Sequence, residues 1–273
     1  MINMGGRLAR SCLYGEEKMP WNPDQYQQFQ TQRATPFQDA LALVRWQEGL
    51  RVIDLGCGTG ELTAQLADRL PGCEVLGVDT AAEMLERAQT YARPGLRFEQ
   101  QAIEDVSGEW DLVFSHSALQ WVVDHRRLIP RLMRHVAAGG QLVAQFPSNH
   151  RHPVHLLLAE TASEDPFRAA FGDWRWHTPV LPLVDYAELL YISSGSAIEA
   201  VEKVYPLVLE VEALVEWMKG TGLIRYLDRL PDDLHEIFVE RYREKLRAQW
   251  PTDPVFYAFT RILVSAVKEQ EEA

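Results

Sequence analysis

The sequence predicts an α/β fold in which helices cover both faces of a mostly parallel β-sheet. Between residues 51 and 146 short apolar segments alternate with amphipathic helical patterns, and this alternation is typical of strand–helix–strand units. The first apolar segment runs directly into a loop with three glycines at alternate positions. After Pro147 helical periodicity dominates, so we expect the C-terminal half to complete the sheet and to add a helical cover over its binding edge.

The predicted strands lie in both halves of the chain, at 51–55, 74–79, 96–101, 111–115, 141–146, 201–211 and 261–267. Parallel strands that are buried on both faces are typically rich in apolar residues along their whole length. Helical patterns occupy other segments, at 61–70, from 80 onwards, 128–136, 154–171 and 212–248. Thr80 and Glu83 have the spacing of a capping box, and Gly139 with Gly140 is expected to stop the helix at 128–136.

The chain divides into an extension at 1–18 and a single domain at 19–273. Glycines interrupt any periodicity in the extension, so we expect it to be disordered. Within the domain we expect the core sheet at about 45–150 and the helical cover from 19–45 and 150–250. Trp21, Tyr26 and Phe29 have near-helical spacing, which predicts either a helix that caps the core or a lid over a ligand.

Composition excludes several classes of protein. The 273 residues include 39 acidic and 27 basic side chains, so the formal net charge is −12. An acidic surface without a dense basic run disfavours binding to a phosphate backbone, and we expect no nucleic-acid partner. No apolar run is long enough to span a membrane, and no secretory signal follows the first basic residues. Three cysteines are too few for a disulfide framework, so a reducing cytoplasm is expected.

The strongest chemical signal is the segment from Val52 to Gly60, in which a strand runs into Gly56-Cys57-Gly58-Thr59-Gly60 and then into a helix. Glycines let the backbone approach a ligand closely, and the helix that follows offers unpaired N–H groups. Asp79 ends the next strand, where a carboxylate can accept both hydroxyls of a ribose. The pattern therefore predicts a cofactor that contains adenosine.

Glu61 helps to distinguish between two cofactor classes. The dinucleotide fingerprint requires a third glycine or alanine at this position, and a carboxylate there would repel a pyrophosphate. The observed spacing instead resembles motif I of class I S-adenosylmethionine-dependent methyltransferases, whose cofactor carries no phosphate. The resemblance implies a Rossmann-like sheet whose last strand is antiparallel. It also implies a set of cofactor-binding residues: Asp54, Gly56, Cys57, Gly58, Thr59, Gly60, Asp79, Thr80, Met84, Ala102, Ile103 and Ser115. Ala102 stands where the family often has the aspartate that binds adenine, so backbone groups of Ala102 and Ile103, or Gln101, would take that role.

A narrower resemblance extends over the chain from residue 19. It is carried by Trp21-Asn22-Pro23 with Tyr26, by Leu119-Gln120-Trp121 with Asp124-His125, by Thr221-Gly222-Leu223 and by Phe259-x-Arg261. These segments resemble the trans-aconitate 2-methyltransferase family, which converts a small polycarboxylate into a monomethyl ester. The resemblance implies that trans-aconitate is the leading methyl acceptor. Two other readings stay open, a methyltransferase for another small molecule or an acyl carrier, and a cofactor-binding protein without catalysis; a nucleotide-dependent oxidoreductase is disfavoured by Glu61.

Esterification of a carboxylate places few demands on the protein, because the attacking oxygen is already ionised near neutral pH and no general base is needed. The remaining carboxylates must be neutralised, since an unpaired buried charge is costly. We therefore predict substrate-binding residues in the matched segments: Trp21, Tyr26, Arg33, His116, Trp121, His155, Arg225 and Arg261. Arg33 and Arg261 are expected to pair with the non-reacting carboxylates.

Two further features bear on the substrate. The family commonly has arginine where this chain has Ile224, and Arg225 follows one position later, so a less charged acid is an alternative acceptor. His150, His152 and His155 could in principle ligate a metal, but Pro153 interrupts a regular helical face, so a loop at the substrate edge is expected instead. The stretch from Trp174 to Trp176 is expected to be a packed or gating segment.

Overall fold

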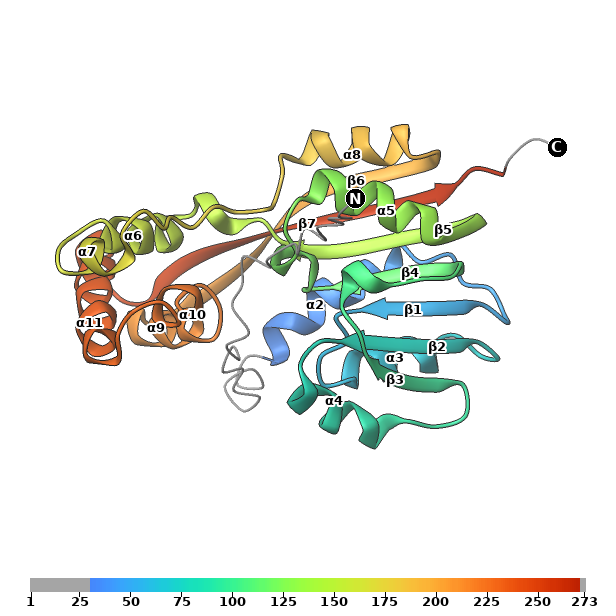
Figure 1. Ribbon diagram of the computed structural model, residues 1–273, viewed down its shortest axis with the longest axis horizontal. Helices are drawn as coiled ribbons and strands as arrows, with labels where there is room; N and C mark the ends of the chain where they lie inside the picture. The colour runs from blue at the N-terminus through green and yellow to red at the C-terminus, as the bar shows by residue number, and fades with distance from the viewer. Residues whose placement is uncertain (1–29, 271–273) are drawn as a thin grey trace, which may run out of the picture.

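The computed structural model describes the backbone of residues 30–270 and the side chains of residues 35–270, and it contains one seven-stranded sheet (Figure 1). The strand order is β3-β2-β1-β4-β5-β7-β6. The strands are β1 Arg51–Leu55, β2 Glu74–Asp79, β3 Leu96–Gln100, β4 Trp110–His116, β5 Val136–Pro147, β6 Gly195–Leu209 and β7 Val255–Lys268. Strands β1 to β5 pair in parallel, whereas β7 is antiparallel to both β5 and β6. The predicted α/β fold, with its last strand antiparallel, is confirmed.

Alternation along each strand divides the core into two layers. Val52 packs in a cluster with α2 (Gln30–Ala42) and α3 (Glu61–Asp68). The next residue, Ile53, packs on the opposite face with α5 (His125–His135) and α8 (Leu183–Ile192). Successive side chains of a strand point to opposite faces, so an uninterrupted apolar strand supplies both layers at once. Helix α4 (Ala82–Ala88) packs beside β2 and β3.

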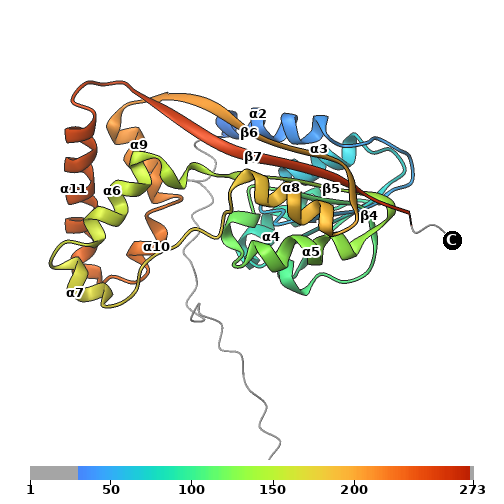
Figure 2. The same ribbon diagram turned by 90° about the horizontal axis from the view of Figure 1, so that it is seen from above.

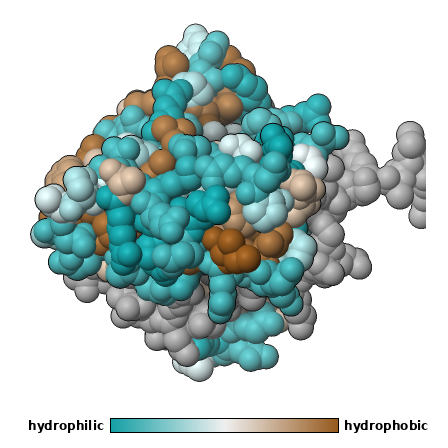
Figure 3. All heavy atoms as spheres, turned by 90° about the vertical axis from the view of Figure 1, so that its left-hand side faces the viewer, coloured by the Kyte–Doolittle hydropathy of each residue, from teal (hydrophilic) through white to brown (hydrophobic). Residues whose placement is uncertain are grey.

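A separate group of helices lies beyond one end of the sheet (Figures 1 and 2). It consists of α6 Pro153–Ala162, α7 Phe167–Phe171, α9 Val211–Lys219, α10 Ile224–Leu227 and α11 Asp232–Gln249. The long strands β6 and β7 extend from the sheet into this group, where Val255, Tyr257 and Phe259 join its apolar core. Its outer face is largely hydrophilic (Figure 3), in keeping with ion pairs such as Arg243–Glu212 at 3.0 Å.

Several local predictions were wrong. The helix before β5 ends at His135, and Gly139 and Gly140 lie inside β5 rather than stopping a helix. Gly140 is required there by close packing, because an added Cβ would lie 2.8 Å from the carbonyl oxygen of Asp111. Strands β6 and β7 are longer than their apolar patterns indicated, because they pair with each other along almost their whole length. Helix α8 was not predicted.

The extension at 1–18, together with Trp21, Tyr26 and Phe29, lies outside the described residues. Helix α2 covers part of the segment that was expected to form the N-terminal cover, and it packs against β5. Within residues 30–270, no helix is both long enough and apolar enough to cross a membrane.

Candidate functional site

The glycine loop follows β1 at the carboxyl edge of the parallel strands. Gly56, Gly58 and Gly60 have φ values of 76°, 55° and 76°, in the left-handed region that favours glycine. A Cβ at Gly56 would lie 2.2 Å from the Cβ of Ala118, and one at Gly60 would lie 2.8 Å from the Cα of Ala88. Among the residues that the structure describes, a Cβ at Gly58 would meet nothing within 4 Å. Gly56 and Gly60 are therefore needed for packing, whereas Gly58 faces open space in which a ligand can approach the backbone.

Asp79 connects the loop to the end of β2. Its Oδ2 accepts a hydrogen bond from the Gly58 N–H at 2.9 Å, and its Oδ1 accepts one from the Ala81 N–H at 2.9 Å. Helix α4 has no side-chain hydrogen bond at its N-cap, so the predicted capping box of Thr80 and Glu83 does not form. Asp79 instead orders the residues before α4. Each of its oxygens can accept further bonds, so the carboxylate remains able to bind a ribose.

Asp54 and Cys57 lie beneath the loop. The Thr63 hydroxyl donates to Asp54 Oδ2 at 2.5 Å, which ties β1 to α3. Burial, opposed by this bond and reinforced by nearby Asp79, raises the pKa of Asp54 to about 7. Burial and the two carboxylates raise the pKa of the Cys57 thiol, so Cys57 is a packing residue and no nucleophile.

The other predicted cofactor residues differ in their exposure. Ala102 and Ile103 are half-buried where β3 leads into a short 3-10 helix, and Met84 is buried in α4. Ser115 is fully buried, and its hydroxyl donates to the Leu55 carbonyl oxygen at 2.9 Å. The Ser115 side chain therefore links β4 to β1 and its hydroxyl is engaged inside the sheet, so its role in cofactor binding stays a prediction that rests on its backbone groups.

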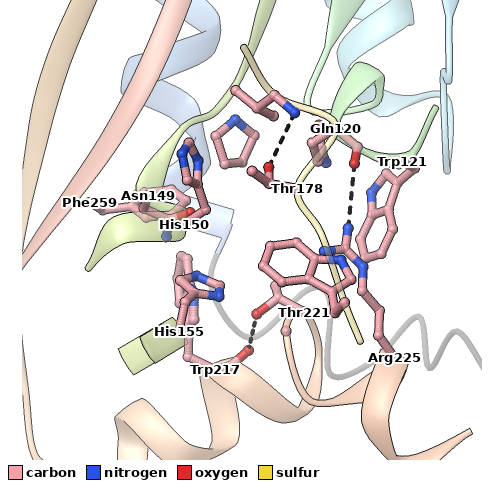
Figure 4. A pocket seen from close by; sticks show the side chains of 14 residues that line it. Gln120, Trp121, Asn149, His150, His155, Thr178, Trp217, Thr221, Arg225 and Phe259 are labelled. Carbon is pink, nitrogen blue, oxygen red and sulfur yellow. Dashed lines mark hydrogen bonds between the residues drawn. The ribbon is translucent and has the colours of Figure 1, made fainter. Parts of the chain in front are cut away.

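A pocket lies between the sheet edge and the helical group (Figure 4). The segment after β4 joins the two sites, because Ala118 contacts Gly56 while Gln120 and Trp121 line the pocket. The remaining lining residues come from the end of β5, the β5–α6 connection, α6, the segment before α8, α9, the α9–α10 connection, α10 and β7: Pro147, Asn149, His150, His155, Trp176, Thr178, Val180, Trp217, Thr221, Gly222, Arg225 and Phe259.

Arg225 is the principal cation of this pocket. Its guanidinium carbon lies 4.3 Å from the ring centroid of Trp121 and 4.9 Å from that of Trp176. Its Nη2 donates to the Gln120 carbonyl oxygen at 3.4 Å. Ring faces attract cations, so the two indoles hold the guanidinium in place. Ile224 is buried and does not line the pocket, so the structure places Arg225, and not position 224, at the predicted substrate site.

Two histidines add neutral nitrogen atoms to the same pocket. His150 Nδ1 and His155 Nε2 are buried and have no hydrogen-bond partner among the described residues. Burial, together with the positive charge of Arg225, lowers the pKa of His155 to about 3. His152 points elsewhere, stacking on Trp250, and residues 35–270 contain no cluster of side chains with the arrangement of metal ligands.

Two other predicted substrate residues, His116 and Arg261, do not lie on the wall of this pocket. His116 is buried and packs edge-to-face on Phe37, with ring centroids 5.5 Å apart. Arg261 is 3% exposed, and its Nη1 donates to Ser117 Oγ at 2.7 Å and to Gln145 Oε1 at 2.8 Å. Arg33 belongs to α2, but its side chain is not among those described.

Trp176 is a site residue that the sequence did not indicate. The aromatic stretch from Trp174 to Trp176 was interpreted as packing or gating, and the structure shows that its two tryptophans have different roles. Trp176 holds Arg225, whereas Trp174 lies under Arg229 at 4.6 Å. Asn149 and Thr221 also line the pocket. Both residues belong to segments that resemble the family, Pro147-x-Asn149 and Thr221-Gly222-Leu223, and that resemblance was the available signal for them.

Comparison with known proteins agrees with this geometry. A family model described as "Methyltransferase domain" matches residues 52–140. The structure of YcgJ from Bacillus subtilis superposes with a TM-score of 0.60 at 17% identity, covering 87% of this chain and 99% of that one. A geranyl diphosphate methyltransferase in complex with SAM superposes at 0.53 with 15% identity, covering 90% and 89%. At such identities the two structures establish a shared fold.

Two relatives are similar over nearly the whole chain. A trans-aconitate 2-methyltransferase from Deinococcus radiodurans is 47% identical over 257 residues, which cover 92% of this chain and 100% of the relative. One from Variovorax paradoxus is 37% identical over 264 residues, covering 92% and 99%. These similarities confirm the predicted enzyme class, a methyltransferase with S-adenosylmethionine as its cofactor. The chain belongs to the trans-aconitate 2-methyltransferase family.

Proposed function

We propose that this protein transfers the methyl group of S-adenosylmethionine to a carboxylate of trans-aconitate. The observation that carries the proposal is Arg225, held between Trp121 and Trp176 in a pocket that the segment after β4 links to the glycine loop. A planar guanidinium between two rings presents its N–H groups edge-on, which suits a planar carboxylate. The relatives from two bacterial genera are named for this activity.

The glycine loop fits S-adenosylmethionine by its shape and by its partners. The open space at Gly58 lets a ligand contact the backbone, and Asp79 lies beside it with lone pairs available for ribose hydroxyls. When bound, S-adenosylmethionine supplies an electrophilic methyl group on a sulfonium. Asp54, Thr63 and the Val78 carbonyl, which accepts from the N–H groups of Gly56 and Cys57 at 2.8 and 2.9 Å, keep the loop in this shape.

The pocket residues bind and orient the acid and need not move a proton. A carboxylate is ionised near neutral pH, so its oxygen can attack the methyl carbon directly. The methyl–sulfur bond breaks, S-adenosylhomocysteine leaves, and the attacked group alone becomes an uncharged methyl ester. Arg225 pairs with a non-reacting carboxylate, and Gln120, Asn149 and Thr221 offer further polar groups. The indole walls exclude water, which strengthens the ion pair and keeps the reacting groups aligned. We also propose a cytoplasmic location, supported by the free thiols of Cys57 and Cys73.

The test is a methyl-transfer assay with isotopically labelled S-adenosylmethionine and a panel of acids: trans-aconitate, cis-aconitate, citrate, tricarballylate and succinate. We expect trans-aconitate to give the highest kcat/KM, and we expect mass spectrometry to find one added methyl group that mild base removes. Label transfer to an amine, to a thiol or only to a carrier-bound acyl group would refute the proposed acceptor. Tight calorimetric binding of NAD in place of S-adenosylmethionine would refute the cofactor.

A further inference from the structure

A buried chain of hydrogen bonds connects two walls of the pocket. His125 at the start of α5 and Tyr186 in α8 are both 0% exposed. His125 Nδ1 lies 2.5 Å from the Tyr186 hydroxyl, and His125 Nε2 lies 2.9 Å from the Leu119 carbonyl oxygen. The Leu181 N–H donates to the same Tyr186 hydroxyl at 3.1 Å.

The partners determine where the protons lie. A carbonyl oxygen can only accept, so His125 Nε2 carries a hydrogen and donates to Leu119. Nδ1 of the neutral imidazole then accepts from the Tyr186 hydroxyl, whose oxygen accepts from the Leu181 N–H. Each bond has one donor and one acceptor, and every polar atom of the two side chains is paired. Burial lowers the pKa of His125, which favours the neutral form that this arrangement requires.

The two ends of this chain of hydrogen bonds, Leu119 and Leu181, belong to the segments that carry the tryptophans around Arg225. Leu119 begins the 3-10 helix that includes Gln120 and ends at Trp121. Leu181 follows directly after Val180, in the segment that also places Trp176 and Thr178 in the pocket. Phe146 packs against both side chains of the pair, with its ring centroid 5.7 Å from that of His125 and 5.2 Å from that of Tyr186.

We propose that His125 and Tyr186 are positioning residues that set the spacing between the Trp121 wall and the Trp176 wall, and thereby the position of the acid bound at Arg225. Neither side chain lines the pocket, so both act through the segments they join. The inference rests on the proposed function, because it takes the acid to be the ligand of this pocket. The glycine loop is tied to β2 by other contacts, through Asp79 and Val78, so we expect the pair to affect acid binding far more than cofactor binding.

The first test compares Tyr186→Phe with Tyr205→Phe. Tyr205 is a matched control, because it is also buried and loses one hydrogen bond, from its hydroxyl to Asp39 Oδ2 at 2.6 Å, between α2 and β6. A shift of about 1 Å in a substrate-positioning wall can cost about 100-fold in rate. We expect Tyr186→Phe to lower kcat/KM for the acid about tenfold to 100-fold, with part of the loss in kcat because the reacting groups are misaligned, and with S-adenosylhomocysteine affinity within about twofold of the wild type. Tyr205→Phe should leave both values near those of the wild type.

Two His125 variants test how far acid binding depends on the two hydrogen bonds of this side chain. His125→Gln can place an amide N–H near Leu119 and keep that bond, whereas His125→Leu removes both bonds. We expect kcat/KM for the acid to fall in the order wild type, His125→Gln, His125→Leu. A parallel loss of acid and cofactor binding in these variants would overturn the proposal, since it would indicate general damage to the fold.

A readout without substrate separates this inference from the proposed function. Hydrogen exchange followed by mass spectrometry should show faster exchange in Tyr186→Phe for peptides covering 117–123 and 174–182, and unchanged exchange for 51–60. If the wild type methylates none of the acids, the proposed function fails, and the exchange data still decide on the positioning pair. Unchanged hydrogen exchange at 117–123 and 174–182 in Tyr186→Phe would overturn the proposal that the pair positions the two walls.

Discussion

Arg225 carries the proposed recognition of the acid, and its replacement gives the sharpest prediction. Arg225→Leu removes the positive charge and the planar group that separates Trp121 from Trp176. Arg229→Leu is the matched control, because Arg229 also lies on a tryptophan, Trp174, and one helical turn away, but outside the pocket. The two variants lose the same side-chain chemistry and differ in whether that side chain faces the pocket.

The size of the effect follows from the two kinds of contact that Arg225 can make. Truncating one partner of a desolvated charge pair costs about 2–5 kcal/mol, which is about 30-fold to several thousand-fold in kcat/KM. Each indole contact adds about 0.5–2 kcal/mol to the placement of the guanidinium. Arg225→Lys keeps the charge but loses the planar fork, so we expect an intermediate loss of about tenfold to 100-fold.

The assay is steady-state methyl transfer to trans-aconitate at saturating S-adenosylmethionine, with calorimetry of S-adenosylhomocysteine as the measure of the cofactor site. We expect Arg225→Leu to lose at least 30-fold in kcat/KM for the acid and to bind the cofactor product normally, whereas Arg229→Leu should change either value less than about threefold. Equal, small effects of the two variants would refute the assignment of Arg225 as the cation that binds the acid. An equal loss of cofactor affinity would refute the separation of the two sites.

Four further predictions test the rest of the site. Asp79→Asn should weaken S-adenosylmethionine binding at least tenfold by calorimetry, because an amide nitrogen cannot accept the N–H of Gly58 or Ala81; an unchanged Kd would contradict it. Gly60→Ala should prevent stable folding, because its Cβ would meet the Ala88 backbone. Gly58→Ala should weaken cofactor binding but lower the unfolding free energy by only about 1–2 kcal/mol. Equal melting temperatures of the two variants would refute this distinction. Ile224→Arg should lower the melting temperature and should not raise activity, because position 224 is buried away from the pocket; a stable, more active variant would show otherwise. Binding of the acid should take up a proton and should strengthen as pH falls from about 7.5 to 6, because a bound anion raises the pKa of His155 from about 3 towards its ordinary value. Calorimetric binding enthalpies that do not depend on the buffer would show that no proton is taken up and would contradict this prediction.

The pKa shifts of His155 and Asp54 make the stability of the fold depend on pH in opposite directions. The pKa of His155 is about 3 in the folded protein and about 6.5 in the unfolded chain, so the unfolded chain binds the proton first and stability falls as pH drops from about 6.5 to 3. The pKa of Asp54 is about 7 in the folded protein and about 3.8 in the unfolded chain. Its contribution to the free energy of unfolding is therefore complete below about pH 3.8 and is lost as pH rises through 7.

The sequence by itself determined the features that depend on local backbone geometry. Gly56, Gly58 and Gly60 were predictable as a cofactor loop because a positive φ and a close backbone approach require glycine at those positions. Asp79 was predictable because it ends the next parallel strand, and the ends of neighbouring parallel strands meet at one edge of the sheet. The parallel sheet followed from apolar strands that alternate with amphipathic helices, and those patterns act over short distances along the chain.

Only the tertiary structure decided which side chains meet in the acid pocket. Trp121, Trp176 and Arg225 are separated by about 50 residues each along the chain, and no local pattern relates them. A shift of one position turns a helical side chain by about 100°, so only the orientation of α10 distinguishes Arg225, which lines the pocket, from buried Ile224. The same reason explains Ser115 and Arg261, whose positions matched the family but whose side chains bond inside the sheet, because burial and partners are set by the packing of distant elements.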